Sequence, residues 1–201
     1  MEVSSVDCTI ESRGVRLSAH LSRPPSAATA GPGPGLVLCH GFPAGPGGAG
    51  TTGQTYPELA ERLSSESGWT VLTFNFRGTG SSPGQFSLAG WLEDVQVAVD
   101  HLLADADVSG VWLAGSSTGG AVSICAAAED DRVRGVAALA APADFSDWAS
   151  DARGFLAYAR EVGVISDPAF PADVDGWARE LHEIRPVTVI GKIPPRAVLL
   201  L

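Results

Sequence analysis

The chain has 201 residues, of which 45% are hydrophobic and 18% are charged, and its formal net charge is -10 at pH 7. This length suits one domain with a substantial core, and the composition is that of a globular protein rather than a disordered one. Lys192 is the only lysine, so the sequence offers no basic patch for nucleic acid or for an anionic membrane.

The cysteines and the N-terminus bear on the compartment. Cys8, Cys39 and Cys125 lack metal-ligand spacing, and each lies in an apolar stretch where a buried free thiol is common. The N-terminal segment has no basic start followed by an apolar core, and no apolar run reaches membrane-spanning length. We therefore expect a soluble, cytoplasmic protein.

The first third of the chain is predicted to form strands. Alternating apolar residues on either side of Arg13 and Gly14 predict an antiparallel hairpin over residues 6–10 and 15–21. After a segment rich in proline and glycine, the continuous apolar run at 36–39 predicts a strand that is buried on both faces.

Helix and strand patterns then alternate. Helices are expected at 56–67, 88–103 and 118–128, and strands at 69–76, 110–114 and 133–140. Strands separated by helices of this length imply a parallel sheet with right-handed crossovers. The sequence therefore predicts an α/β fold, with a mostly parallel central sheet, an antiparallel N-terminal hairpin and helices on both faces.

The alternation breaks at residues 142–195. Amphipathic stretches at 145–162 and 174–184, with prolines between and after them, suggest a small helical cap inserted over a site. Another buried-strand pattern follows at 196–201, where the chain ends.

The residues Gly115-Ser116-Ser117-Thr118-Gly119 match the pattern G-x-S-x-G. In a nucleophile elbow this pattern forms a sharp strand-to-helix turn that lifts the serine oxygen out of the sheet. The expected strand at 110–114 leads in, and an alanine-rich helix leads out. A serine before a helix is also a common N-cap, so the pattern alone is not specific.

A second motif supports the first. His40-Gly41-Phe42-Pro43 follows a buried strand, the position that supplies a second oxyanion donor in folds with such an elbow. The backbone N–H groups of Phe42 and Thr118 are expected to converge on the carbonyl oxygen that Ser117 attacks. We interpret His40 itself as a structural histidine that braces this loop.

These motifs occur in a familiar order. Four segments follow one another along the chain: HGFP, Phe74 to Ser82, the elbow, and Ala141-Pro142-Ala143-Asp144. Together they resemble the bacterial α/β-hydrolases, most closely small esterase and serine-peptidase-like members. The resemblance implies acyl transfer from a small-molecule ester, thioester or amide through an acyl-enzyme, with no metal or organic cofactor. Asn75 stands where many members carry aspartate, in a segment that is generally structural.

A second departure concerns the catalytic triad. In the family the acid usually follows the strand that here is 196–201, and the histidine comes later still. We therefore expect the domain to be C-terminally truncated and to lack its catalytic histidine. Asp144 and His182 are the stand-in acid and base that the chain itself offers.

Two alternatives remain open at this point. One is a hydrolase-like domain that binds a small ligand or partner without catalysis. The other is a dinucleotide-binding oxidoreductase, because residues 45–50 fit G-x-G-x-x-G, with Arg77 available for a phosphorylated cofactor. Three features argue against the second alternative. Five residues separate the strand from the first glycine, Pro46 stiffens the turn, and the next strand ends without a ribose-binding acid.

The substrate class is also open among esterase, thioesterase, peptidase and acyltransferase, as is the oligomeric state. Four aromatic residues of the 142–195 segment could line an acyl pocket or belong to the core: Trp148, Phe155, Tyr158 and Trp177.

Overall fold

A computed structural model describes residues 3–25, 31–105 and 107–201. Its strands form one sheet in the order β1-β2-β4-β3-β5-β6-β7. Their bounds are β1 Ser4–Ser12, β2 Val15–Arg23, β3 Gly33–Cys39, β4 Thr70–Phe74, β5 Val108–Ser116, β6 Val133–Leu139 and β7 Ala197–Leu200. The pairs β1–β2 and β2–β4 are antiparallel, and the remaining pairs are parallel. The predicted hairpin and the mostly parallel sheet are confirmed.

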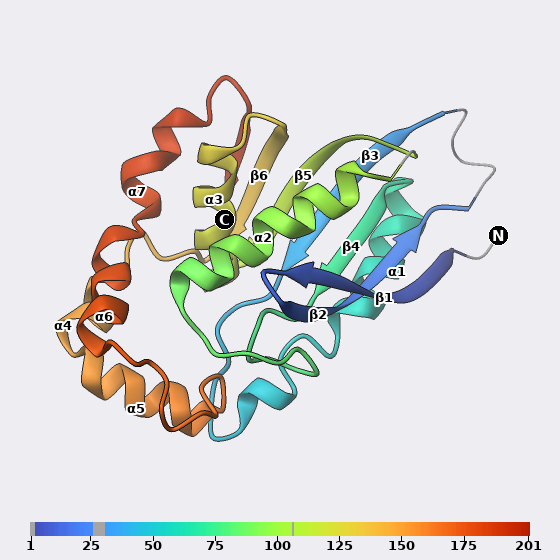
Figure 1. The fold of residues 1–201 in the computed structure, drawn as a ribbon. Helices are drawn as coiled ribbons and strands as arrows, with labels where there is room; N and C mark the ends of the chain where they lie inside the picture. Colours follow the sequence, from blue (N-terminus) through green and yellow to red (C-terminus); the bar gives the residue numbers. More distant parts are fainter. Residues whose placement is uncertain (1–2, 26–30, 106) are drawn as a thin grey trace.

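The helices cover both faces of this sheet. Their bounds are α1 Tyr56–Ser67, α2 Leu88–Leu103, α3 Thr118–Glu129, α4 Ser146–Ser150, α5 Ala152–Val162, α6 Val174–Glu183 and α7 Pro186–Val189, with 3-10 turns η1 Gly48–Gly50 and η2 Ile190–Lys192. Figure 1 shows α2 passing in front of the sheet and α1 behind it. None of the helices described has both the length and the apolarity needed to cross a bilayer.

Two buried clusters hold the layers together. The larger lies on the face of α2 and α3, with Trp91, Phe76 and Leu113 inaccessible or nearly so. The smaller lies under α1, around Leu38 and Val71. Because successive strand residues point to opposite faces, Val37 and Leu38 of β3 belong to different clusters.

Local signals set the helix ends. The Ser87 side chain accepts a hydrogen bond from the Gly90 N–H and so caps the start of α2. Gly68, at φ 73°, adopts the left-handed conformation that ends α1. Both helices have the bounds that the sequence predicts, because the apolar spacing and these end signals agree.

The segment 145–162 is two helices rather than one continuous stretch. Asp151 separates α4 from α5, and its side chain accepts a hydrogen bond from the Gly154 N–H. This cap satisfies a donor that a continuous helix would bond internally, so the helix restarts at Ala152.

The strand expected at 196–201 forms as β7, but it is less buried than its apolar pattern indicates. β7 pairs only with β6 and forms an edge of the described sheet. Leu199 and Leu200 are 51% and 58% exposed. The apolar run resembles that of a central strand, but sequence pattern alone does not show whether a neighbour covers it.

Candidate active site

Ser117 lies at the turn between β5 and α3, as the motif predicts. Its backbone has φ 50° and ψ -125°, a conformation that residues other than glycine rarely adopt. Its N–H donates a 2.8 Å hydrogen bond to the carbonyl oxygen of Leu139 on β6, which helps to hold the turn. Ser117 is exposed while Thr118 beside it is buried, so the turn presents one hydroxyl to solvent.

The flanking glycines allow this turn to pack closely. A Cβ on Gly115 would lie 2.6 Å from the backbone carbon of Gly119. A Cβ on Gly119 would lie 2.7 Å from the carbonyl oxygen of Cys39, and closer still to that of His40. Only glycine fits at either position, and the first turn of α3 therefore rests directly on the end of β3.

The HGFP loop passes beside Ser117. A Cβ on Gly41 would lie 3.2 Å from the Cβ of Ser117. Thr118 is the first residue of α3, so its N–H has no acceptor within the helix. Neither this N–H nor that of Phe42 makes a hydrogen bond among the residues described. Two free donors therefore flank the turn that carries the serine.

His40 is locked inside this loop. Its side chain is 1% exposed; Nδ1 lies 2.8 Å from the carbonyl oxygen of Gly41, and Nε2 accepts from the Phe76 N–H at 3.2 Å. Nδ1 therefore carries the proton. Burial lowers the pKa of His40 to about 4, so the ring is neutral near pH 7. His40 therefore braces the loop, and both of its ring nitrogens are engaged by other backbone groups.

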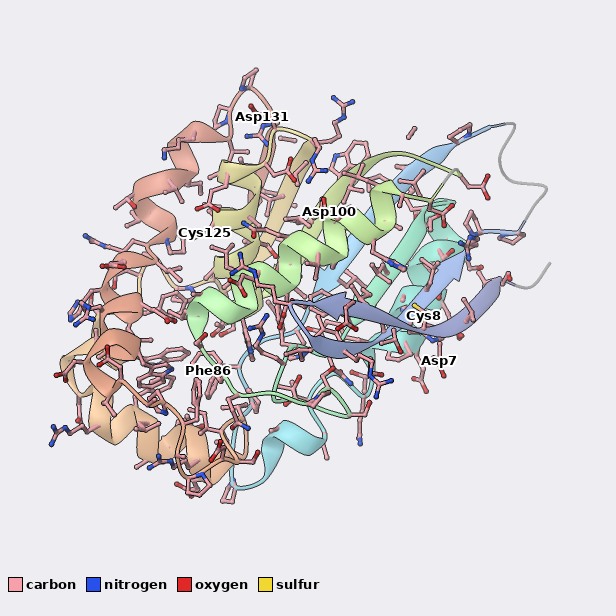
Figure 2. The ribbon with its side chains drawn as sticks, viewed as in Figure 1. Asp7, Cys8, Phe86, Asp100, Cys125 and Asp131 are labelled. Carbon is pink, nitrogen blue, oxygen red and sulfur yellow. The ribbon has the colours of Figure 1, made fainter. Side chains whose placement is uncertain are left out.

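The ring of Phe42 ties the same loop to the helices of the 142–195 segment. It lies 5.0 Å from the rings of both Phe86 and Trp148 and 5.5 Å from that of Phe155. Trp148 stacks on Phe155 at 4.0 Å, and Phe155 stacks on Trp177 at 5.6 Å. Figure 2 shows Phe86 below the N-terminal end of α2, facing α5 and α6.

The four aromatic candidates for the pocket divide between core and surface. Phe155 and Trp177 are 7% and 3% exposed and belong to the core. Trp148 is half-buried and Tyr158 is 39% exposed. The ring of Tyr158 lies 6.2 Å from that of Phe42, so Trp148 and Tyr158 are the two that reach the surface near the loop.

The structure does not bring the two stand-in triad residues to Ser117. Asp144 follows β6; it accepts from the Ser146 N–H at 2.9 Å, which lowers the pKa of Asp144, and lies 3.5 Å from the guanidinium of Arg185. His182 is exposed on α6. Within the part of the chain that is described, no hydrogen bond joins either residue to Ser117 or to the other.

A family model described as alpha/beta hydrolase fold matches residues 34–162 of the chain. The chain belongs to this family. The strand order and the turn around Ser117 agree with that assignment. Among curated protein sequences, none is similar enough to count as a match.

Solved structures of α/β-hydrolases resemble this one. Est1E from Butyrivibrio proteoclasticus, with ferulic acid bound, is 24% identical over 71% of this chain and 55% of that one, with a TM-score of 0.60. XC6422 from Xanthomonas campestris, a serine hydrolase without a lid, is 28% identical over 72% of this chain and 66% of that one, with a TM-score of 0.58. The acylaminoacyl peptidase of Pyrococcus horikoshii is 15% identical, with a TM-score of 0.67, over 100% of this chain and 31% of that one. In these three alignments the α/β-hydrolase chain covers 31% to 66% of the other chain's length.

The remaining histidines of this α/β-hydrolase lie elsewhere. His20, on β2, has Nδ1 2.7 Å from Asp7 and Nε2 3.4 Å from Glu61. His101 lies in the last turn of α2. Neither has a hydrogen bond to Ser117 in the described ranges.

Burial disfavours Cys39 and Cys125 as alternative nucleophiles. Burial raises the pKa of both Cys39 and Cys125 to about 12, which suppresses the reactive thiolate near pH 7. Figure 2 places Cys8 and Cys125 toward opposite ends of the sheet.

The dinucleotide hypothesis finds no support in the fold. Gly50 ends η1, and five residues separate it from the start of α1 at Tyr56, whereas a dinucleotide fingerprint opens directly into its helix. The Arg77 guanidinium lies 2.7 Å from the buried carboxylate of Asp94 and 3.0 Å from the hydroxyl of Ser12. Arg77 is therefore committed to a buried ion pair and not to a cofactor phosphate.

Two residues beside the turn escaped the sequence analysis. The hydroxyl of Tyr56 lies 3.0 Å from the hydroxyl of Ser116. Ser116 occupies a variable position of the motif, and Tyr56 shows in the sequence only as the start of a helix. No pattern connects residues 60 positions apart, so only the fold could reveal this contact.

Proposed function

We propose that this chain carries the nucleophile of a serine hydrolase. Ser117 attacks the carbonyl carbon of an ester, thioester or amide, and water then releases the acyl group from the acyl-enzyme. The observation that carries the proposal is the exposed Ser117 hydroxyl on a turn at φ 50°, held between two glycines that admit no side chain. Membership of the α/β-hydrolase family supports it.

The neighbouring groups suit this chemistry. As the Ser117 oxygen bonds to the carbonyl carbon, negative charge moves to the carbonyl oxygen, and the free N–H groups of Phe42 and Thr118 are the proposed donors to it. The N-terminus of α3 adds the positive end of a helix dipole. Each such donor stabilises a tetrahedral transition state by about 3 kcal/mol.

The reaction also requires a base for the Ser117 proton. That proton must later reach the leaving alcohol, thiol or amine. We propose two possible sources for the base: His182 with Asp144, after α6 has moved, or a histidine from outside these 201 residues. The experiment below separates them.

We propose that the substrate is a small molecule with an apolar acyl part, and that residues 142–195 form the cap that covers it. The rings of Phe42, Trp148 and Tyr158 supply an apolar surface next to the serine turn. An apolar surface binds acyl chains and aromatic acids by removing them from water. One structural relative, Est1E, holds ferulic acid.

Trapping of the acyl-enzyme tests this function. The chain is incubated with p-nitrophenyl acetate, butyrate or benzoate, quenched in acid and weighed intact by mass spectrometry. We expect one acyl adduct on Ser117, none on Ser117→Ala, and an unchanged adduct on Ser67→Ala, which removes an exposed serine at the far end of α1. An adduct that survives Ser117→Ala would contradict the proposal. Loss of the adduct in His182→Ala would identify the internal base.

A second candidate is a binding domain without catalysis. It is favoured by the absence, in the described parts of the chain, of a histidine hydrogen-bonded to Ser117. Calorimetric titration with butyrate and benzoate distinguishes it. Saturable binding that is weakened by Trp148→Ala, without any acyl adduct from the matching esters, would establish binding in place of hydrolysis.

A further inference from the structure

Two hydroxyl groups meet directly behind the serine turn. The Tyr56 hydroxyl is 3.0 Å from that of Ser116, and both residues are half-buried. Tyr56 is the first residue of α1, and Ser116 is the last residue of β5, immediately before Ser117. The contact therefore joins the start of a helix on one face of the sheet to the strand that carries the nucleophile.

Ser116 also contacts the loop that carries the other oxyanion donor. A Cβ on Gly41 would lie 3.2 Å from the carbonyl oxygen of Ser116 and 3.5 Å from its hydroxyl. Gly41 precedes Phe42, so a shift of Ser116 toward the loop would displace the Phe42 N–H. No larger residue at position 41 would leave this spacing intact.

Tyr56 contacts the same loop from its other side. Its ring meets that of His40 edge to face, with centroids 6.0 Å apart and planes at 81°. Its backbone N–H donates a 2.9 Å hydrogen bond to the carbonyl oxygen of Gly53, which fixes the start of α1. The Tyr56 side chain, at the fixed start of α1, thus touches both segments that carry the proposed donors.

We propose that Tyr56 and Ser116 form a positioning pair that sets the distance between the Phe42 loop and the Ser117 turn. This inference rests on the proposed function, because the spacing matters only if both segments act on one carbonyl oxygen. Catalytic groups must be held within about 0.5 Å of their productive geometry. A displacement of about 1 Å can lower the rate on the order of a hundredfold. Neither hydroxyl touches the reacting atoms.

The test compares Tyr56→Phe, Ser116→Ala and the double variant, each of which removes one or both hydroxyls without creating a large cavity. Ser67→Ala is the control, since it removes a hydroxyl that bonds to Leu63 at the far end of the same helix. Two measurements are made on the full chain. One is hydrogen exchange of the backbone amides of 40–42 and 116–118. The other is the labelling of Ser117 by a fluorophosphonate, resolved into the maximal rate and the half-saturating concentration.

We expect both single variants to exchange the amides of 40–42 and 116–118 several times faster, and the double variant to exchange them no faster than either. The maximal labelling rate should fall about tenfold, with the half-saturating concentration and the unfolding midpoint unchanged. Unaltered exchange in both single variants, or effects that add in the double variant, would overturn the pair. Labelling that survives Ser117→Ala would count against the proposed function, while the exchange comparison would still decide the pairing.

Discussion

At the scale of single residues, the strain at Ser117 is the central feature. A residue other than glycine held in such a conformation costs roughly 1–3 kcal/mol, which surrounding contacts must offset. Those contacts include the hydrogen bond to Leu139 and the close approach of Gly115 to Gly119. The motif predicts this turn from sequence because the chemistry requires small flanking residues. The sequence predicts that His40 braces its loop, but it does not predict the partner Phe76, which lies far away in the chain.

Gly119→Ala should destabilise the fold. The added methyl group would meet the carbonyl oxygens of Cys39 and His40, and backbone cannot move aside as a flexible side chain can. We expect the free energy of unfolding to fall by about 3 kcal/mol in urea denaturation. Gly191→Ala is the control, because its methyl group would meet nothing within 4 Å. Equal stability of the two variants would show that α3 does not pack on β3 as described.

His40 should make stability depend on pH. Its pKa is lowered from 6.5 to about 4 by burial, so between these values the unfolded chain binds a proton that the folded chain does not. The free energy of unfolding should therefore have its full value above pH 6.5 and fall by about 3 kcal/mol as the pH drops to 4. In urea denaturation at several pH values, the slope of the free energy of unfolding against pH between 4 and 6.5 should be smaller in His40→Gln. An unchanged slope in the variant would mean that His40 is not buried as a neutral ring.

At the scale of elements, prediction succeeds where local signals agree. The bounds of α1 and α2 follow from apolar spacing together with Gly68 and Ser87. Prediction from the sequence is less complete at 142–195, where Asp151 restarts a helix and α7 is a single short turn. At β7 the strand is predicted but its exposure is not, because burial of a strand depends on neighbours that its own sequence does not specify.

The attachment of α6 to the core can be tested. The Trp177 indole N–H donates a 3.2 Å hydrogen bond to the carbonyl oxygen of Phe86, and the ring is 3% exposed. Trp177→Phe keeps an aromatic ring against Phe155 but leaves this carbonyl unpaired, so the free energy of unfolding should fall by about 2 kcal/mol. Trp112→Phe is the control, since no hydrogen bond of its indole is found among the described residues. Equal losses in urea denaturation would argue against the α6 contact.

At the scale of the whole molecule, apolar side chains gather at the β7 edge of the sheet. An apolar groove of about 260 Å³ lies there, between α7, the end of β6 and the end of the chain. Five apolar side chains of this region are 43% to 72% exposed: Leu139, Val187, Leu199, Leu200 and Leu201. An exposed strand edge with apolar side chains favours association between chains.

This 201-residue chain should therefore self-associate as its concentration rises. Leu200→Lys places a charge on the exposed edge and should shift the sedimentation profile toward the monomer without lowering the free energy of unfolding. Leu59→Lys, at a site on α1 that is 40% exposed, should leave association as in the unchanged chain. Monomeric behaviour of the unchanged chain at all concentrations would contradict the expectation.

The most direct test of the whole account is whether Ser117 reacts as an activated nucleophile. The folded chain is exposed to a fluorophosphonate and weighed intact, because such a probe reports an activated serine without assuming a substrate. We expect a single adduct that is absent in Ser117→Ala and retained in Ser67→Ala. Equal labelling of Ser117→Ala would contradict the assignment of Ser117 as the nucleophile, whereas a folded chain that stays unlabelled would favour a base from outside these 201 residues.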